Sequence, residues 1–176
     1  RRIGRLRLAS SSASPIDVSS VSFWMTSGAA STRNCLASNC RAARDTYDAK
    51  QSPANTCEAM NIPDIFNAPY LFDVQVNGNE LVIHNQPWEV VRRIPLTGEA
   101  VTTEPQAAFG VVRGRIDGAT VILDSEGFPP SRWGLGSATQ FLGSGTDLPS
   151  SAQKKVSERF SLSEDGLTLN YDYTLE

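Results

Sequence analysis

Residues 72–83 read FDVQVNGNELVI, two strand-like runs joined at Asn77-Gly78. The same arrangement recurs around Asp117-Gly118 and around Asp165-Gly166. Asn-Gly and Asp-Gly dipeptides suit the primed turns, whose positive φ angles match the twist of the flanking strands. The sequence therefore predicts three β-hairpins, each with a two-residue turn.

These hairpins predict an all-β fold. We expect an antiparallel up-and-down barrel or a strongly curved sheet, with a β-sandwich as the alternative. One helix is expected on the N-terminal side over residues 31–48, where apolar residues recur at helical spacing. The domain is expected to cover residues 31–176. Residues 1–30 would supply N-terminal strands and a Ser-rich loop, which allows them to be the tail of a preceding region.

The first residues and the two ends of the chain lead to two further expectations. In the run Arg5-Leu6-Arg7-Leu8, charged and apolar side chains alternate, as in a half-buried edge strand whose arginines face water. The chain begins in this strand-like run without a Met and stops within another at Glu176. We therefore expect it to be a segment of a longer polypeptide.

Composition excludes several functional classes. The 176 residues suit one hydrophobic core, and the net charge of −3 provides no basic field for nucleic acid. No apolar run approaches the roughly 20 residues of a membrane-spanning helix, so no transmembrane segment is expected. The Gly-rich run at residues 134–139 lacks the Lys-Ser/Thr pair of a phosphate-binding loop, and no set of Cys and His has metal-ligand spacing. We expect neither a cofactor nor a metal.

Two charged side chains are predicted to point into the core. Arg92 is in phase with the apolar residues of its strand, including Trp88, and Glu158 is in phase with Val156 and Phe160. A lone buried charge is costly, so the two are expected to meet. Either they form a structural ion pair, or they line a cavity in which Arg92 anchors an anion and Glu158 acts as acceptor or general base.

Two further residues are candidates, an aromatic residue and the single histidine. Trp133 lies within a long Gly-, Ser- and Pro-rich segment, residues 127–151, and either packs at the rim of the sheet or meets a ligand. His84 is the only histidine and is expected at the surface, where it supports neither a catalytic triad nor a metal site.

The three cysteines favour an oxidising compartment. Cys35 and Cys40 are expected to be bonded to each other, with Cys57 free and buried. Positions five apart within one continuous helix cannot be bridged, so this bond requires the helix to begin late, near Asn39. Otherwise Cys57 takes one of the partners. Reduced cysteines that pack in the core are the alternative.

Four segments carry a resemblance to a known family. They are residues 67–72 (NAPYLF), 91–98 (VRRIPLTG), 114–121 (GRIDGATV) and 158–160 (ERF). In order and spacing they resemble a broad family of uncharacterised exported bacterial β-rich proteins that run PYPFEI, RRIYLDG, GRWEGDTLVV and ERF. The resemblance covers residues 45–176, and Ile116 stands where that family tends to have Trp. It implies a periplasmic or extracellular antiparallel β-domain with further sequence after Glu176, and it assigns no catalytic residues.

Three functions are therefore open. The first is a non-enzymatic domain of the bacterial cell envelope that binds a small ligand or a protein, with Arg92, Glu158, Trp88 and Trp133 as candidate contacts. The second is a structural or accessory subunit of a larger assembly. The third is an enzyme that uses an Arg92/Glu158 cavity, which requires open space beside those two side chains.

Overall fold

A computed structural model of the chain describes residues 2–10, 21–25, 42, 46, 48–66, 71–102, 106–136 and 147–176. Its strands are β1 (Arg2–Ser10), β2 (Val21–Met25), β3 (Phe72–Asn77), β4 (Glu80–Asn85), β5 (Val90–Pro95), β6 (Thr97–Val101), β7 (Val111–Asp117), β8 (Thr120–Glu126), β9 (Ser131–Gly136), β10 (Leu148–Ser150), β11 (Val156–Leu162) and β12 (Thr168–Leu175). The 3-10 helices are η2 (Ala49–Gln51), η3 (Pro53–Thr56), η4 (Asp64–Phe66), η5 (Gln86–Trp88) and η6 (Gln106–Phe109). Within the described ranges, every helix is too short or too polar to cross a bilayer.

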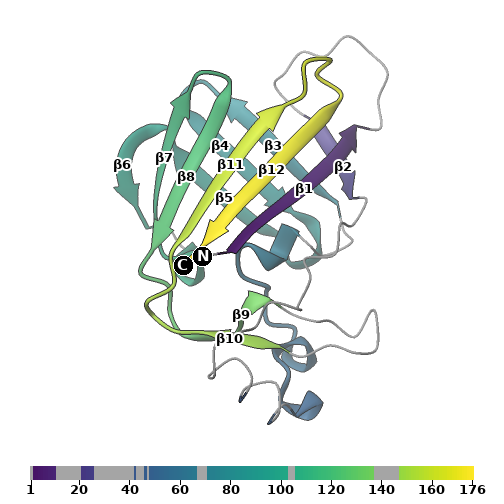
Figure 1. Ribbon diagram of the computed structural model, residues 1–176, viewed down its shortest axis with the longest axis vertical. Coiled ribbons are helices and arrows are strands. Elements are labelled where there is room, and N and C mark those ends of the chain that lie inside the picture. Colours follow the sequence, from purple (N-terminus) through teal and green to yellow (C-terminus); the bar gives the residue numbers. More distant parts are fainter. Residues whose placement is uncertain are drawn as a thin grey trace.

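Ten strands form one sheet in the order β5-β4-β3-β2-β1-β12-β11-β8-β7-β6, and β9 pairs with β10 in a separate ribbon. All paired neighbours are antiparallel, which confirms the predicted all-β antiparallel class. The sheet curls, so that β3, β4 and β5 pass behind β8, β11 and β12 (Figure 1). Among the described strands no hydrogen-bonded pairing joins β5 to β6 or β7, so the ladder is not closed.

The two ends of the curled sheet approach each other at Gly114 of β7. A Cβ atom on Gly114 would lie 2.8 Å from Cγ2 of Ile94 and 2.8 Å from the carbonyl oxygen of Pro95 at the end of β5. Both distances are shorter than Cβ contacts in proteins, so glycine is what allows β7 to come this close to β5. This contact supports the curled shape.

Three hairpins turn at the same end of the sheet. Each step between antiparallel neighbours reverses direction, so β3, β7 and β11 all run the same way and turn into β4, β8 and β12 at one end. We call this the hairpin end and the opposite one the packed end. The turns of β7–β8 and β11–β12 lie at the top of Figure 1.

The first two predicted hairpins are confirmed, with their turns one residue later than the dipeptides suggest. Asn77 pairs with Glu80 and Asp117 pairs with Thr120, so a glycine opens each two-residue turn. Gly78 has φ 61° and Gly118 has φ 59°, whereas the residue after each glycine has no positive φ. Glycine first and positive φ there alone match the type II′ turn.

The third hairpin is also present, but its two-residue turn was wrongly predicted. Strand β11 ends at Leu162 and β12 begins at Thr168, which leaves a longer loop between them. Within it, the Gly166 amide donates to the Ser163 carbonyl at 2.9 Å, and Gly166 has φ 68°. Ser163 also accepts the Thr168 amide, so side chains of the loop close the hairpin in place of a tight turn.

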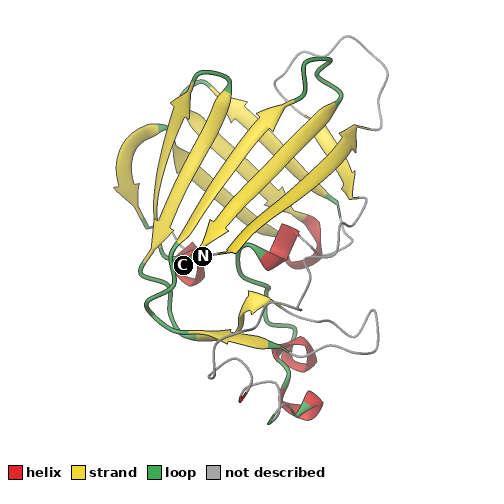
Figure 2. Cartoon of the chain, viewed as in Figure 1, coloured by secondary structure: helices red, strands yellow, loops and turns green. Residues whose placement is uncertain are grey.

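The segment before β3 fills the packed end. Met60, Ile62, Ile65 and Phe66 are all buried in the core. The Phe66 ring contacts Phe72, Phe160 and Tyr171 at centroid distances of 5.2, 5.7 and 4.5 Å, so it sits between three strands. The short helices and the β9–β10 ribbon lie toward the same end (Figure 2). The Gly-, Ser- and Pro-rich segment thus contains two strands that were not predicted.

The N-terminal region differs from its prediction in strand order, and part of it lies outside the described residues. The first strand was expected at an edge, but β1 lies inside the sheet between β12 and β2, with Arg5 opposite Asp172. The edge-strand prediction was wrong because strand order depends on pairings with distant segments, which alternation within one strand does not specify. Most of the helix expected over residues 31–48 lies outside the described residues, as do Cys35 and Cys40.

Candidate functional site

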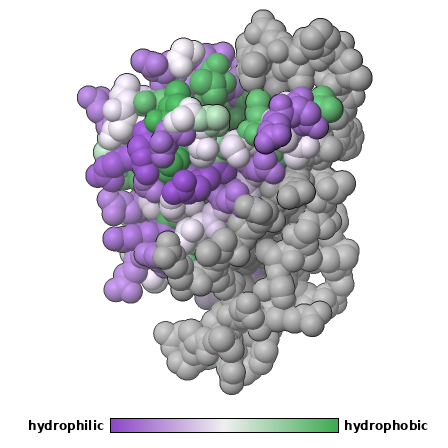
Figure 3. Space-filling view, turned by 45° about the horizontal axis from the view of Figure 1, so that its top comes forward, coloured by the Kyte–Doolittle hydropathy of each residue, from purple (hydrophilic) through white to green (hydrophobic). Residues whose placement is uncertain are grey.

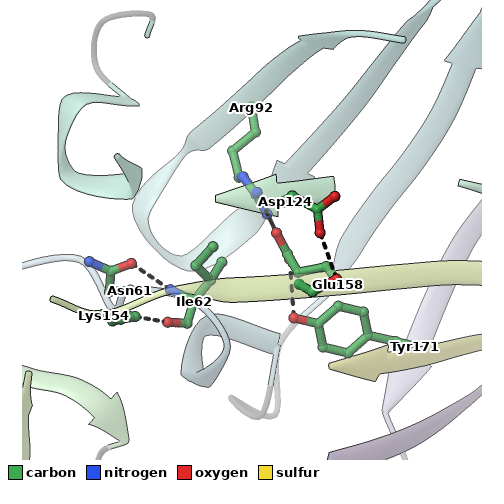
Figure 4. Close-up of polar contacts among 8 residues, drawn as sticks. Asn61, Ile62, Arg92, Asp124, Lys154, Glu158 and Tyr171 are labelled. Carbon is green, nitrogen blue, oxygen red and sulfur yellow. Dashed lines mark hydrogen bonds and ion pairs between the residues drawn. The ribbon is translucent and has the colours of Figure 1, made fainter. Parts of the chain in front are cut away.

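A buried ion pair joins Arg92 of β5 to Glu158 of β11 (Figure 4). Arg92 Nη1 donates to Glu158 Oε1 at 3.0 Å, and Nη2 donates to Oε2 at 2.7 Å. The side chains are 1% and 0% exposed. Since β5 and β11 are not neighbours in the sheet, the pair crosses the interior. This geometry confirms the prediction that both side chains point inward and meet.

Tyr171 of β12 completes the network by donating its hydroxyl to Glu158 Oε1 at 3.1 Å. Burial raises the pKa of Tyr171 well above its ordinary value, and the negative charge of Glu158 raises it further. Burial alone would lower the pKa of Arg92, but the charge and hydrogen bonds of Glu158 outweigh it and raise that pKa. At neutral pH Tyr171 therefore keeps its proton and Arg92 its charge.

The geometry of this network fits a structural role, in which it holds β5, β11 and β12 together. A general base or an anion anchor must be within reach of its ligand. The Glu158 oxygens already accept hydrogen bonds from Arg92 and Tyr171, and the pair has almost no contact with solvent. A ligand-binding role for either residue would require the pair to open.

Lys154, in the turn before β11, is a buried lysine that the sequence did not reveal. Its Nζ donates to the carbonyl oxygens of Ile62 and Gly134, each at 2.5 Å. It also lies 4.4 Å from the centre of the Phe128 ring. Ile62 belongs to the segment that fills the packed end and Gly134 to β9, so Lys154 joins two parts of that end.

The environment of Lys154 changes its proton affinity. Burial lowers the pKa of Lys154 to about 7, against the opposing attraction of the Glu158 and Asp64 carboxylates. A neutral amine still has two N–H donors, which is the number of carbonyl bonds it makes. Lys155 beside it is exposed, so nothing in the Lys-Lys dipeptide distinguishes the buried residue.

The two candidate tryptophans contact each other. Trp133 of β9 is buried and Trp88 of η5 is half-buried, with ring centroids 6.4 Å apart and planes at 73°. This edge-to-face contact is a stabilising aromatic arrangement. Trp133 therefore follows the packing alternative, while Trp88 keeps part of its surface open.

The free cysteine and the single histidine of the sequence lie at the surface. Cys57 is a free, exposed thiol, so the expectation that it is buried was wrong. It follows a 3-10 helix in a turn with φ 56°, where its side chain faces away from the core. His84 is half-buried on β4, with Nε2 3.0 Å from Glu89 Oε2.

The outer face of β7, β8, β11 and β12 has an open groove of about 360 Å³ lined by charged and hydroxyl side chains. Arg113 donates to Glu126 at 2.9 Å, and Asp124 accepts hydrogen bonds from Arg115 and Ser157. Partial burial works against ionisation of Asp124, but these hydrogen bonds prevail and lower its pKa. Opposite charges in the groove pair with one another, as is usual on an exposed sheet.

The hairpin end presents a different surface. Among residues 48–176, where the structure describes side-chain burial, all the exposed large hydrophobic side chains lie there: Val76 (38% exposed), Ile116 (50%), Leu162 (38%) and Leu167 (46%). We call these four the apolar rim. Figure 3, turned so that this end comes forward, shows hydrophobic residues gathered among hydrophilic ones.

The rim residues continue the inward-facing rows of their hairpins. In steps of two residues, Val76 follows buried Phe72, Ile116 follows buried Val112, and Leu162 follows buried Phe160. Leu167 precedes buried Leu169 by the same step. The rim is therefore the outer edge of the core-facing surface.

Comparisons with protein-family models, with curated proteins and with solved structures each found no match to this chain.

Proposed function

We propose that this chain is a non-enzymatic ligand-binding β-domain of the bacterial cell envelope, and that it holds the apolar part of a small amphiphilic ligand at the apolar rim. The observation that carries the proposal is that the exposed large apolar side chains of the described residues gather at one end of the sheet, on inward-facing positions. Exposed apolar side chains gathered in one place commonly mark a binding site. The mouth of a β-barrel is a frequent place for small ligands.

We further propose that the curled sheet works as an up-and-down barrel, filled at the packed end and accessible at the hairpin end. Three features support this architecture. Gly114 brings β7 against the end of β5, Arg92 and Glu158 tie strands across the interior, and Phe66 packs among three strands. Such a barrel would leave a ligand one route of entry, past the rim.

The envelope location rests on the resemblance of residues 45–176 to exported bacterial proteins. It can be tested on the natural protein in its host. Release by osmotic shock supports the proposal, whereas recovery only with cytosolic proteins contradicts it.

Binding at the rim can be tested with alkyl probes of increasing length. We expect octyl, nonyl and decyl chains with one common head group, all below their micelle concentrations, to bind about fourfold more tightly per methylene. This factor follows because each buried methylene contributes about 0.8 kcal/mol. Isothermal titration calorimetry gives the dissociation constants. Affinity that does not change with chain length would contradict apolar binding.

Variants of the rim locate the site. Ile116→Ser and Leu167→Ser should each weaken decyl binding about five- to tenfold, since each removes apolar area worth about 1 kcal/mol or slightly more. Both residues are about half exposed, so the melting temperature should change little. Val82→Ser is the matched control, because Val82 is a half-buried apolar residue on the outer face of β4. Equal weakening by all three variants would place the site elsewhere.

The enzyme alternative has less support, since Arg92 and Glu158 have almost no contact with solvent. The accessory-subunit alternative predicts an obligate complex. A stable monomer in size-exclusion chromatography with light scattering would argue against it.

A further inference from the structure

The turns around the apolar rim carry carboxylates. Asp117 directly follows Ile116, and Glu164 and Asp165 lie between Leu162 and Leu167. All three acidic side chains are exposed. The apolar rim therefore stands beside several negative charges.

Asp165 is held in its ionised form by its own turn. Its Oδ1 accepts the Ser163 hydroxyl at 2.5 Å and the Leu167 amide at 3.0 Å. Hydrogen bonds from Ser163 and from the Leu167 amide lower the pKa of Asp165. The same contacts fix this carboxylate beside Leu167 of the rim.

Two arginines on neighbouring strands have carboxylate partners of their own. Arg115 of β7 is paired with Asp124, and Arg93 of β5 is paired with Glu80 at 3.2 Å. The turns themselves, residues 77–80, 117–120 and 163–168, contain no Lys or Arg. These three turns, the described part of the hairpin end, thus combine apolar contact with an excess of negative charge.

We infer that the ligand of the apolar rim is a cationic amphiphile, with an apolar body and an ammonium or guanidinium group. The apolar part of the ligand contacts the four rim side chains, and its cationic group stays at the hairpin end beside Asp117, Glu164 and Asp165. The rim has four side chains among those whose burial the structure describes, fewer than the roughly 20 to 30 residues that each partner contributes to a stable protein interface, which favours a small ligand. This inference rests on the proposed binding function and adds the charge of the ligand to it.

The test compares three probes with the same decyl chain. They are decyltrimethylammonium, uncharged decyldimethylamine oxide and decanoate, each below its micelle concentration at neutral pH and low ionic strength. We expect the cation to bind about three- to tenfold more tightly than the neutral probe, and the anion to bind most weakly. Added salt should shrink these differences because it screens exposed charges.

Neutralised variants identify the source of the preference. In the double variant Asp117→Asn/Glu164→Gln, the preference for the cation should fall toward unity while affinity for the neutral probe is kept. Asp165 is left intact because it holds the turn. Glu58→Gln is the matched control, an exposed carboxylate in the segment of the packed end. It should keep the full preference.

The possible failures are distinguishable. Equal binding of all three probes would overturn the cationic ligand and leave the proposed function standing. A preference that persists in Asp117→Asn/Glu164→Gln would also overturn it. Failure of all three probes to bind would overturn both proposals.

Discussion

Arg92 and Glu158 lie 66 residues apart in the sequence and meet through two charge-assisted hydrogen bonds of 3.0 and 2.7 Å. Both side chains are removed from water, so each depends on the other to offset its desolvation. The fold is therefore stable only when β5 and β11 are placed so that these two side chains meet. It connects the local alternation of two strands to the curl of the whole sheet.

Breaking this pair should be costly, whereas replacing both partners should cost less. We expect Arg92→Met to lower the free energy of unfolding by about 3–5 kcal/mol, because Glu158 is left buried and unpaired. The double variant Arg92→Met/Glu158→Leu should recover much of the loss. Urea denaturation measures both. A coupling energy near zero between the two positions would contradict a stabilising ion pair between them.

Tyr171 offers a milder test of the same network. Tyr171→Phe removes the hydroxyl that donates to Glu158 and leaves the Arg92 bonds in place. We expect a loss of about 1.5–3 kcal/mol, the range for a hydrogen bond to a charged group. A loss as large as that of Arg92→Met would show that the hydroxyl, and not the ion pair, dominates the network.

Lys154 should make stability rise with pH. Its pKa is about 7 in the folded chain against an ordinary 10.5. Between these values the unfolded chain holds a proton that the folded chain has released, so a higher pH favours folding. This group contributes up to about 1.4 kcal/mol per pH unit, seen as a rise between about pH 7 and pH 9.5. Above about pH 10, ionisation of Tyr171 in the unfolded chain opposes the trend.

The control for this pH dependence is Lys154→Met, which removes the titrating group. The variant should show a flatter profile over the same interval in urea denaturation at each pH. A wild-type stability that falls between pH 7 and pH 9, or a variant with an unchanged slope, would show that Lys154 is charged in the folded state.

Gly114 should tolerate no side chain. Gly114→Ala places a methyl group against the Pro95 carbonyl and Ile94, and the carbonyl belongs to a backbone that moves little. Overpacking of this kind costs about 1–3 kcal/mol. Thermal unfolding by circular dichroism measures the loss. An unchanged melting temperature would mean that the approach of β7 to β5 does not support the curl.

The three cysteines are expected to differ in their reactivity toward an alkylating reagent. Cys57 is exposed and should be alkylated in the native protein. Cys35 and Cys40 should be alkylated only after reduction and unfolding, as expected for a bonded pair. Peptide mass spectrometry before and after reduction separates these cases. Three labelled thiols in the native, unreduced protein would contradict the bond and weaken the case for export.

Period-two alternation was sufficient to predict the hairpins and the inward direction of Arg92 and Glu158. Alternation is a local property of extended chain, and the glycine turns mark where a strand reverses. Continued to the ends of the strands, the same alternation puts Leu162 and Leu167 on the core side. It did not show that they are exposed at the rim, because the end of the sheet is defined only once all the strands are assembled.

The features that the sequence did not reveal depend on distant contacts. Lys154 lies in a turn with no period, and its burial follows from Ile62 and Gly134, which approach it from other parts of the chain. Phe66 lies in a proline-containing segment without regular strand alternation, yet it packs among three strands. Nothing local to β1 indicates that β2 covers its second edge.

Binding at the apolar rim is tested most directly by a titration of ¹⁵N-labelled protein with decyltrimethylammonium, followed by amide chemical shifts. We predict saturable shifts concentrated at residues 76–80, 116–120 and 162–168, with little change at residues 113 and 155–159 along the outer groove. Shifts centred on the groove, or scattered over the surface without saturation, would contradict a ligand site at the hairpin end.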